Sequence, residues 1–68
     1  MKVVLNGESR ELPDGASVAD VVLVTGASQA ERGIAVAVDG EVVPSGRWAE
    51  RALSGGESVE VVRAVQGG

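Results

Sequence analysis

The group best suited to chemistry in this chain is its C-terminal carboxylate, because the sequence has no Cys, His or Tyr and few other reactive side chains. The chain ends in Val65-Gln66-Gly67-Gly68, directly after a Val-rich run that is typical of a strand. Glycine has no Cβ, so Gly67 and Gly68 predict a slender, flexible arm that can enter a narrow channel. The sequence therefore indicates a main-chain carboxylate on Gly68 that another enzyme activates.

Size and composition limit what else the chain can be. Its 68 residues suffice for one domain. Without Cys or His, neither a disulfide nor a structural zinc site is expected. The Asp and Glu residues are scattered, so we expect an acidic solvated surface and no metal site. Stability must come from apolar packing, which a hydrophobic content of 44% can support.

The charge of the chain argues against two classes of partner. A net charge of −4 disfavours binding to nucleic acid or to an anionic membrane surface. It favours a basic protein surface, although solubility alone also explains acidity. No stretch is long and apolar enough for a membrane span, and Met1–Leu5 is too short for a signal peptide. Together with the absence of Cys, this predicts a cytoplasmic protein.

Two short turn motifs predict hairpins. Asn6-Gly7 is expected to join strands over 2–5 and 8–12, and Asp39-Gly40 to join strands over 34–38 and 41–43. Both dipeptides suit a type I′ turn, which requires positive φ at its two central residues.

A helix is predicted between the hairpins. Ser17 and Asp20 have the spacing of a capping box, and Gly26 can end the helix. One stripe at helical spacing is formed by Val18, Val21, Val22 and Thr25. The run 21–24 (VVLV) would indicate a strand on local propensity, but the caps favour a helix.

The remaining segments complete a two-layer domain. Residues 47–53 are expected to form a short helical turn with Trp48 and Leu53 facing inward, and residues 58–65 a last strand. One helix across one face of a mixed sheet of four to five strands is the economical solution, an α+β fold. The domain is expected to span 1–65, with 66–68 as a flexible tail.

This order, with a Gly-Gly end after the last strand, resembles the ubiquitin-like β-grasp fold. The resemblance is closer to the ThiS family, the sulfur carriers of thiamine biosynthesis. It rests on Asn6-Gly7-Glu8, the run 35–44 (AVAVDGEVVP), Trp48 four residues after Pro44, and the final 59–68 (VEVVRAVQGG). The resemblance covers essentially the whole chain. Asp39 departs from the Asn that is commoner before the hairpin Gly, but no departure touches the tail.

The resemblance implies a cycle of reactions. A ubiquitin-activating-type enzyme would adenylate Gly68 with ATP, and a sulfur donor such as a cysteine desulfurase would convert it to a thiocarboxylate. Thiazole synthase would then receive the sulfur. On this reading the chain is a protein co-substrate rather than an enzyme and binds no cofactor itself, and Gln66 and Gly67 thread into the partner.

Strand parity suggests where partners dock. If Val59 and Val61 face the helix, Val62 faces away, beside Ala35 and Ala37 if their strand is adjacent. With Val65, these residues are the candidate docking residues, because an exposed apolar patch often marks an interface. The alternative is that Ala35 and Ala37 lie beneath the helix.

Other functions fit the tail as well. The small subunit of molybdopterin synthase also ends in Gly-Gly, but it tends to be richer in Phe, which this chain lacks. A ubiquitin-like tag would form an isopeptide through Gly68. A small interaction domain with an inert tail is the plainest alternative.

Overall fold

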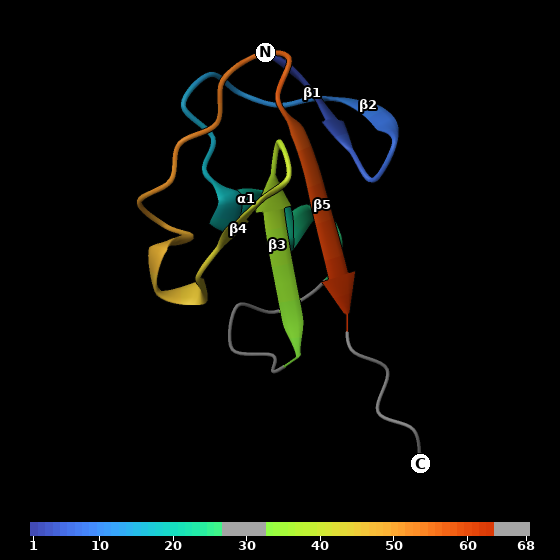
Figure 1. The fold of residues 1–68 in the computed structure, drawn as a ribbon. Helices are drawn as coiled ribbons and strands as arrows, with labels where there is room; N and C mark the ends of the chain where they lie inside the picture. Colours follow the sequence, from blue (N-terminus) through green and yellow to red (C-terminus); the bar gives the residue numbers. More distant parts are fainter. Residues whose placement is uncertain (27–32, 64–68) are drawn as a thin grey trace.

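The computed structural model describes residues 1–26 and 33–63 (Figure 1). Its elements are β1 (Lys2–Leu5), β2 (Glu8–Glu11), α1 (Val18–Val24), β3 (Ile34–Val38), β4 (Glu41–Val43), the 3₁₀ helix η1 (Ser45–Arg47) and β5 (Ser58–Arg63). The strands form one sheet in the order β2-β1-β5-β3-β4, and α1 packs across one face of it. The expected α+β architecture of a β-grasp domain is confirmed, with five strands.

The strand β5 occupies the centre of the sheet. It pairs parallel with β1 and antiparallel with β3, which makes the sheet mixed. The β1–β2 and β3–β4 pairs are both antiparallel hairpins, and neither pairs with the other directly. The sheet is therefore two hairpins joined through β5.

Both predicted hairpin turns are present, and both are tied to β5. The φ angles are 49° and 83° at Asn6 and Gly7, and 50° and 84° at Asp39 and Gly40, as a type I′ turn requires. The Asn6 side-chain oxygen accepts a hydrogen bond from the Val61 N–H at 2.8 Å. Asp39 Oδ1 likewise accepts one from the N–H of Ser58, at the start of β5, at 2.8 Å. Each turn residue thus shapes its own hairpin and holds it against the central strand.

The helix α1 begins and ends where the caps predict. The backbone N–H of Asp20 donates to Ser17 Oγ at 3.3 Å, and Asp20 Oδ2 accepts from the Ser17 N–H at 2.8 Å. The N–H of Gly26 donates to the Leu23 carbonyl beyond the last turn. Val18, Val21 and Val22 are fully buried against the sheet. Burial of this stripe outweighs the β propensity of the valines.

The core is mostly valine, and Trp48 is part of it. The Trp48 side chain is 3% exposed, and its Nε1 donates to the Val43 carbonyl at 2.9 Å. Leu53 is also buried, as expected. A polar partner for the indole and nearly complete burial identify Trp48 as a structural residue.

The prediction of a helical turn over 47–53 is correct for its first part and wrong in its limits. The N–H groups of Glu50 and Arg51 both donate to the Arg47 carbonyl, so a turn is present over 47–51. The helical residues are Ser45–Arg47, preceded by Pro44, whose φ of −59° suits the entry to a helical turn. From Arg51 onward the backbone bonds instead to the segment before α1. The Val18 N–H donates to the Arg51 carbonyl and the Leu53 N–H to the Ala16 carbonyl. These long-range bonds end the turn.

One predicted strand boundary differs from the structure, and other predicted segments lie outside the described residues. The strand β2 ends at Glu11, one residue before the expected limit, although the Leu12 N–H still donates to the Met1 carbonyl. The last residues of the expected strand 58–65, most of the loop 27–33 and the tail 66–68 lie outside the described residues. No helix within the described ranges is long and apolar enough to span a membrane.

Candidate functional site

The face of the sheet opposite α1 carries a small apolar patch. In the sheet register, Ala35 lies opposite Val62 on β5, and Ala37 lies opposite Val42 on β4. Val62 is 57% exposed and Val42 is 69% exposed. We call Ala35, Ala37, Val42 and Val62 the outer-face patch.

The predicted strand parity is confirmed for β3 and β5. Val59 is fully buried, and Val61 is partly buried and packs against the core, so Val62 lies on the other face. Val36 and Val38 are buried on the helix side, which places Ala35 and Ala37 away from it. The alternative that the two alanines lie beneath the helix is therefore wrong. Whether this patch docks a partner stays a prediction.

Sequence reasoning missed one member of the patch, Val42. A two-residue turn at Asp39-Gly40 places Val38 opposite Glu41, so the next pair is Ala37 with Val42. A hairpin with a two-residue turn at Asp39-Gly40, as predicted, is sufficient to fix this pairing. Extending the parity argument across the turn would have found Val42.

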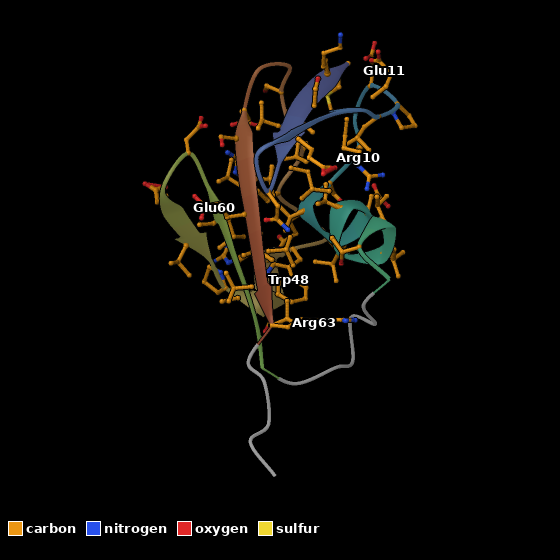
Figure 2. All side chains as sticks on the ribbon, turned by 90° about the vertical axis from the view of Figure 1, so that its right-hand side faces the viewer. Arg10, Glu11, Trp48, Glu60 and Arg63 are labelled. Carbon is orange, nitrogen blue, oxygen red and sulfur yellow. The ribbon has the colours of Figure 1, made fainter. Side chains whose placement is uncertain are left out.

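A carboxylate lies within the same face. Glu60 is opposite Ala37 in the register and shares its face with Val62. Figure 2 shows Glu60 on the side of β5 away from α1. It is exposed, and its side chain makes no hydrogen bond or ion pair within residues 1–26 and 33–63. The apolar outer-face patch therefore has one acidic group directly beside it.

The tail residues Val65, Gln66, Gly67 and Gly68 lie outside the described residues. The end of β5 is described, however, and Arg63 lies opposite Ile34 at one end of the sheet. Residues 64–68 follow Arg63, so Gly68 is at most about 17 Å further along an extended chain. The tail therefore starts one residue after Val62, at one end of the outer-face patch.

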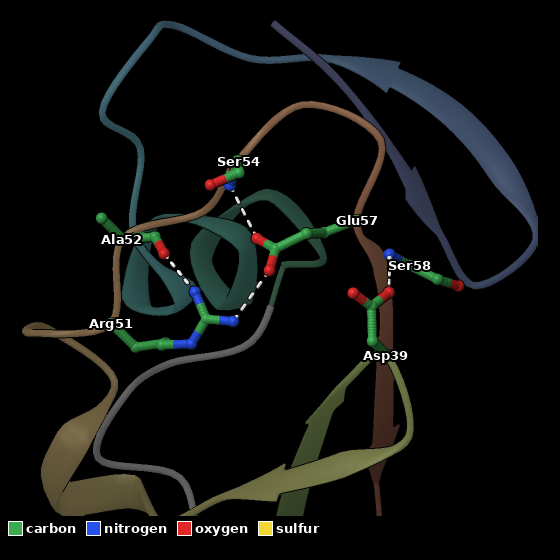
Figure 3. Close-up of polar contacts among 6 residues, drawn as sticks. All are labelled: Asp39, Arg51, Ala52, Ser54, Glu57 and Ser58. Atoms are coloured by element: carbon green, nitrogen blue, oxygen red, sulfur yellow. Dashed lines mark hydrogen bonds and ion pairs between the residues drawn. The ribbon is translucent and has the colours of Figure 1, made fainter.

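A network of polar contacts supports the segment that leads into β5 (Figure 3). Arg51 Nη2 donates to Glu57 Oε2 at 2.8 Å, and the Ser54 N–H donates to Glu57 Oε1 at 2.6 Å. The Arg51 guanidinium, followed by the Ser54 N–H, lowers the pKa of Glu57. Arg51 also donates to the Ala52 carbonyl. Every group here already has a partner, so the network is structural.

Two open hollows lie elsewhere on the described surface. One, of about 320 Å³, lies along β4 and η1, and the other, of about 440 Å³, lies between Leu12 and Val24. In the second, Asp14 pairs with the N-terminal ammonium and Asp20 caps α1, so both carboxylates are engaged. Within the described ranges, no group of three or more Asp or Glu residues could hold a metal ion.

Comparison with known proteins settles the family. The ThiS family profile matches residues 3–68, nearly the whole chain and including its Gly-Gly end. The chain belongs to the ThiS family. No curated protein matches this ThiS-family chain in sequence.

Two solved structures from Geobacter metallireducens share its fold. The crystal structure of the thiamine biosynthesis protein ThiS superimposes with a TM-score of 0.79 at 21% identity, covering 100% of both chains. The solution structure of a thiamine biosynthesis protein gives a TM-score of 0.80 at 23% identity, covering 100% of this chain and 88% of that one.

Proposed function

We propose that this ThiS-family chain is a sulfur carrier of thiamine biosynthesis that works through the main-chain carboxylate of Gly68. The observation that carries the proposal is the family match, which extends through Gly67 and Gly68. The chain's lack of Cys and His is compatible with it, because a carrier of this kind needs no side-chain nucleophile. The chain is then a co-substrate of other enzymes.

The proposed chemistry has two steps on the tail. A carboxylate is a poor electrophile, so a ubiquitin-activating-type enzyme first joins Gly68 to AMP from ATP and releases pyrophosphate. Sulfide, or the terminal sulfur of a persulfide on a donor such as a cysteine desulfurase, then attacks the carbonyl carbon, and AMP leaves. Sulfide gives the thiocarboxylate directly, whereas a persulfide gives an acyl disulfide from which a second thiol releases the thiocarboxylate by forming a disulfide with the donor. Thiazole synthase would take up this sulfur. ATP belongs to the activating enzyme, and the chain itself holds no cofactor in this scheme.

The folded domain would position the tail for both partners. Ala35 and Val62 of the outer-face patch lie one residue from the end of β5. A partner that covers them would therefore be close to the point where the tail begins. In this scheme Val65 continues the contact, and Gln66 and Gly67 pass into the active site of the partner. We also propose a cytoplasmic location, which suits a chain without Cys.

Intact-mass analysis tests the proposal. The chain is incubated with the adenylating enzyme of the thiamine pathway from the same organism, ATP and sulfide. A sulfur carrier gains the mass difference between sulfur and one carboxylate oxygen, and omission of ATP abolishes the gain. A covalent conjugate with a lysine-containing protein would instead identify a ubiquitin-like tag. An unchanged mass in all reactions would contradict both readings.

Growth of a deletion strain provides an independent check. If the chain supplies sulfur to thiazole formation, cells without the gene require thiamine or its thiazole part. The same cells should not require the pyrimidine part of thiamine, because the carrier acts only on the thiazole branch. Growth without any supplement would remove the assignment to this pathway.

A further inference from the structure

The position of Glu60 constrains the chemistry of whatever covers the outer-face patch. Its neighbours on this face are Ala37 across the register, and Ser58 and Val62 along β5. On its other side the β1–β5 pairing stops at Leu5 and Val59, so no strand residue of β1 lies beside it. A partner that buries Ala37 and Val62 must therefore also remove water from the Glu60 carboxylate.

That carboxylate has no compensating group in the described part of its own chain. Lys2 shares this face but lies at the far end of β1, opposite Glu11 in the register. By strand parity Arg63 belongs to the helix side, opposite Ile34. A buried carboxylate without a partner is strongly destabilising, because the loss of hydration is not offset. Docking on the patch is favourable only if the partner supplies the missing cation.

We propose that the partner surface that covers the outer-face patch is apolar and carries one cationic side chain, an arginine for preference, that pairs with Glu60. Arginine is weakly hydrated and presents two parallel N–H donors to a carboxylate, which suits an ion pair enclosed by apolar groups. Ala35, Val42 and Val62 supply the apolar surround. The inference rests on the proposed function, since it describes the partner of the same docking face.

Binding and loading kinetics with Glu60→Gln test this inference. The substitution keeps the shape of the side chain and removes its charge. We expect the affinity for the adenylating enzyme of the same organism to fall roughly 10- to 100-fold, as for removal of one member of an enclosed charge pair. The KM of sulfur loading should rise with it, while kcat stays within about two-fold, because the tail is unaltered.

Glu8→Gln is the matched control. Glu8 is an exposed carboxylate on the outermost strand β2, opposite the buried Leu5 and thus on the helix side of the sheet. It changes the net charge by the same amount, so it reports the general effect of charge on association. Its affinity should stay within about two-fold of the wild type. Both variants should have the thermal midpoint of the wild type, followed by Trp48 fluorescence.

The outcomes separate this inference from the proposed function. Wild-type chain that gains sulfur normally, with Glu60→Gln and Glu8→Gln behaving alike, overturns the ion pair and leaves the carrier function intact. Tighter binding by Glu60→Gln would also overturn it. Wild-type chain that is neither bound nor loaded overturns both. A selective loss in Glu60→Gln that weakens as salt rises supports the pair.

Discussion

The valines of β5 alternate between the two faces of the sheet, and this alternation defines the candidate site at the level of single residues. Val59 is fully buried, whereas Val62 is 57% exposed. Val61, which parity also places on the helix side, is only partly buried. The same residue type thus stabilises the core at one position and presents apolar surface at another.

Replacing Val62 with Asp should therefore leave the fold intact and weaken docking. An exposed substitution usually changes the free energy of unfolding by about 0.5 kcal/mol or less, whereas an unpaired carboxylate in the core costs several kcal/mol. Val59→Asp is the control and should unfold the domain. Urea titration and binding to the activating enzyme measure the two effects. If Val62→Asp unfolds the protein as readily as Val59→Asp, the patch is part of the core.

The ion pair between Glu57 and Arg51 predicts a pH dependence of stability. The guanidinium holds the pKa of Glu57 below its ordinary 4.5, so the stabilisation is present above pH 4.5 and is lost as pH falls through the lowered pKa. Glu57→Gln should cost about 1 kcal/mol or less at pH 7. Urea titrations at pH 7 and pH 3 should show the gap between variant and wild type closing at acid pH. A constant gap would mean that the charge is unimportant.

At the scale of elements, the turns and helix limits that depend on neighbouring residues could be predicted from the sequence. The two hairpins follow from Asn6-Gly7 and Asp39-Gly40, and the limits of α1 follow from Ser17 and Gly26, because each signal acts on its nearest neighbours. The end of the turn at residues 51–53 could not be predicted in this way. Its conformation depends on hydrogen bonds to residues 16–18, more than thirty positions away.

The site was predictable to a similar extent. Alternation along β3 and β5 placed Ala35, Ala37 and Val62 on one face correctly, since a strand has a period of two. The hydrogen bond from Val61 to Asn6 had no local signal, because it joins residues far apart in sequence. Glu60 was visible as the neighbour of Val61, but its apolar surroundings emerged only from the register with β3.

The first hairpin offers a test of its tie to β5. Asn6→Gly keeps the positive φ of the turn but removes the acceptor of the Val61 N–H, so it should cost about 1 kcal/mol. Asn6→Ala loses the same bond and also places a Cβ at a φ of 49°, so it should cost more. Urea unfolding followed by Trp48 fluorescence gives both values. Equal costs would show that the backbone conformation contributes nothing here.

For the molecule as a whole, the fold separates stability from chemistry. The core comprises residues from Val3 to Val59 within the described ranges, whereas the proposed reactive group is on Gly68. Removal of Gly68 should leave the urea midpoint unchanged and abolish sulfur loading, as measured by intact mass. Amidation of the Gly68 carboxylate on a full-length chain is the matched control and should also prevent loading. Normal sulfur uptake by either protein would contradict the carrier function.

The central place of β5 has a consequence for how the domain assembles. Within residues 1–26 and 33–63, the two hairpins share no strand pairing except through residues 58–63. We expect a fragment that ends at residue 57 to show neither the cooperative unfolding nor the buried Trp48 fluorescence of the full chain. A prematurely terminated or clipped chain would then lack both the tail and the assembled docking face. Assembly of the domain and presentation of the reactive end would then depend on one and the same strand.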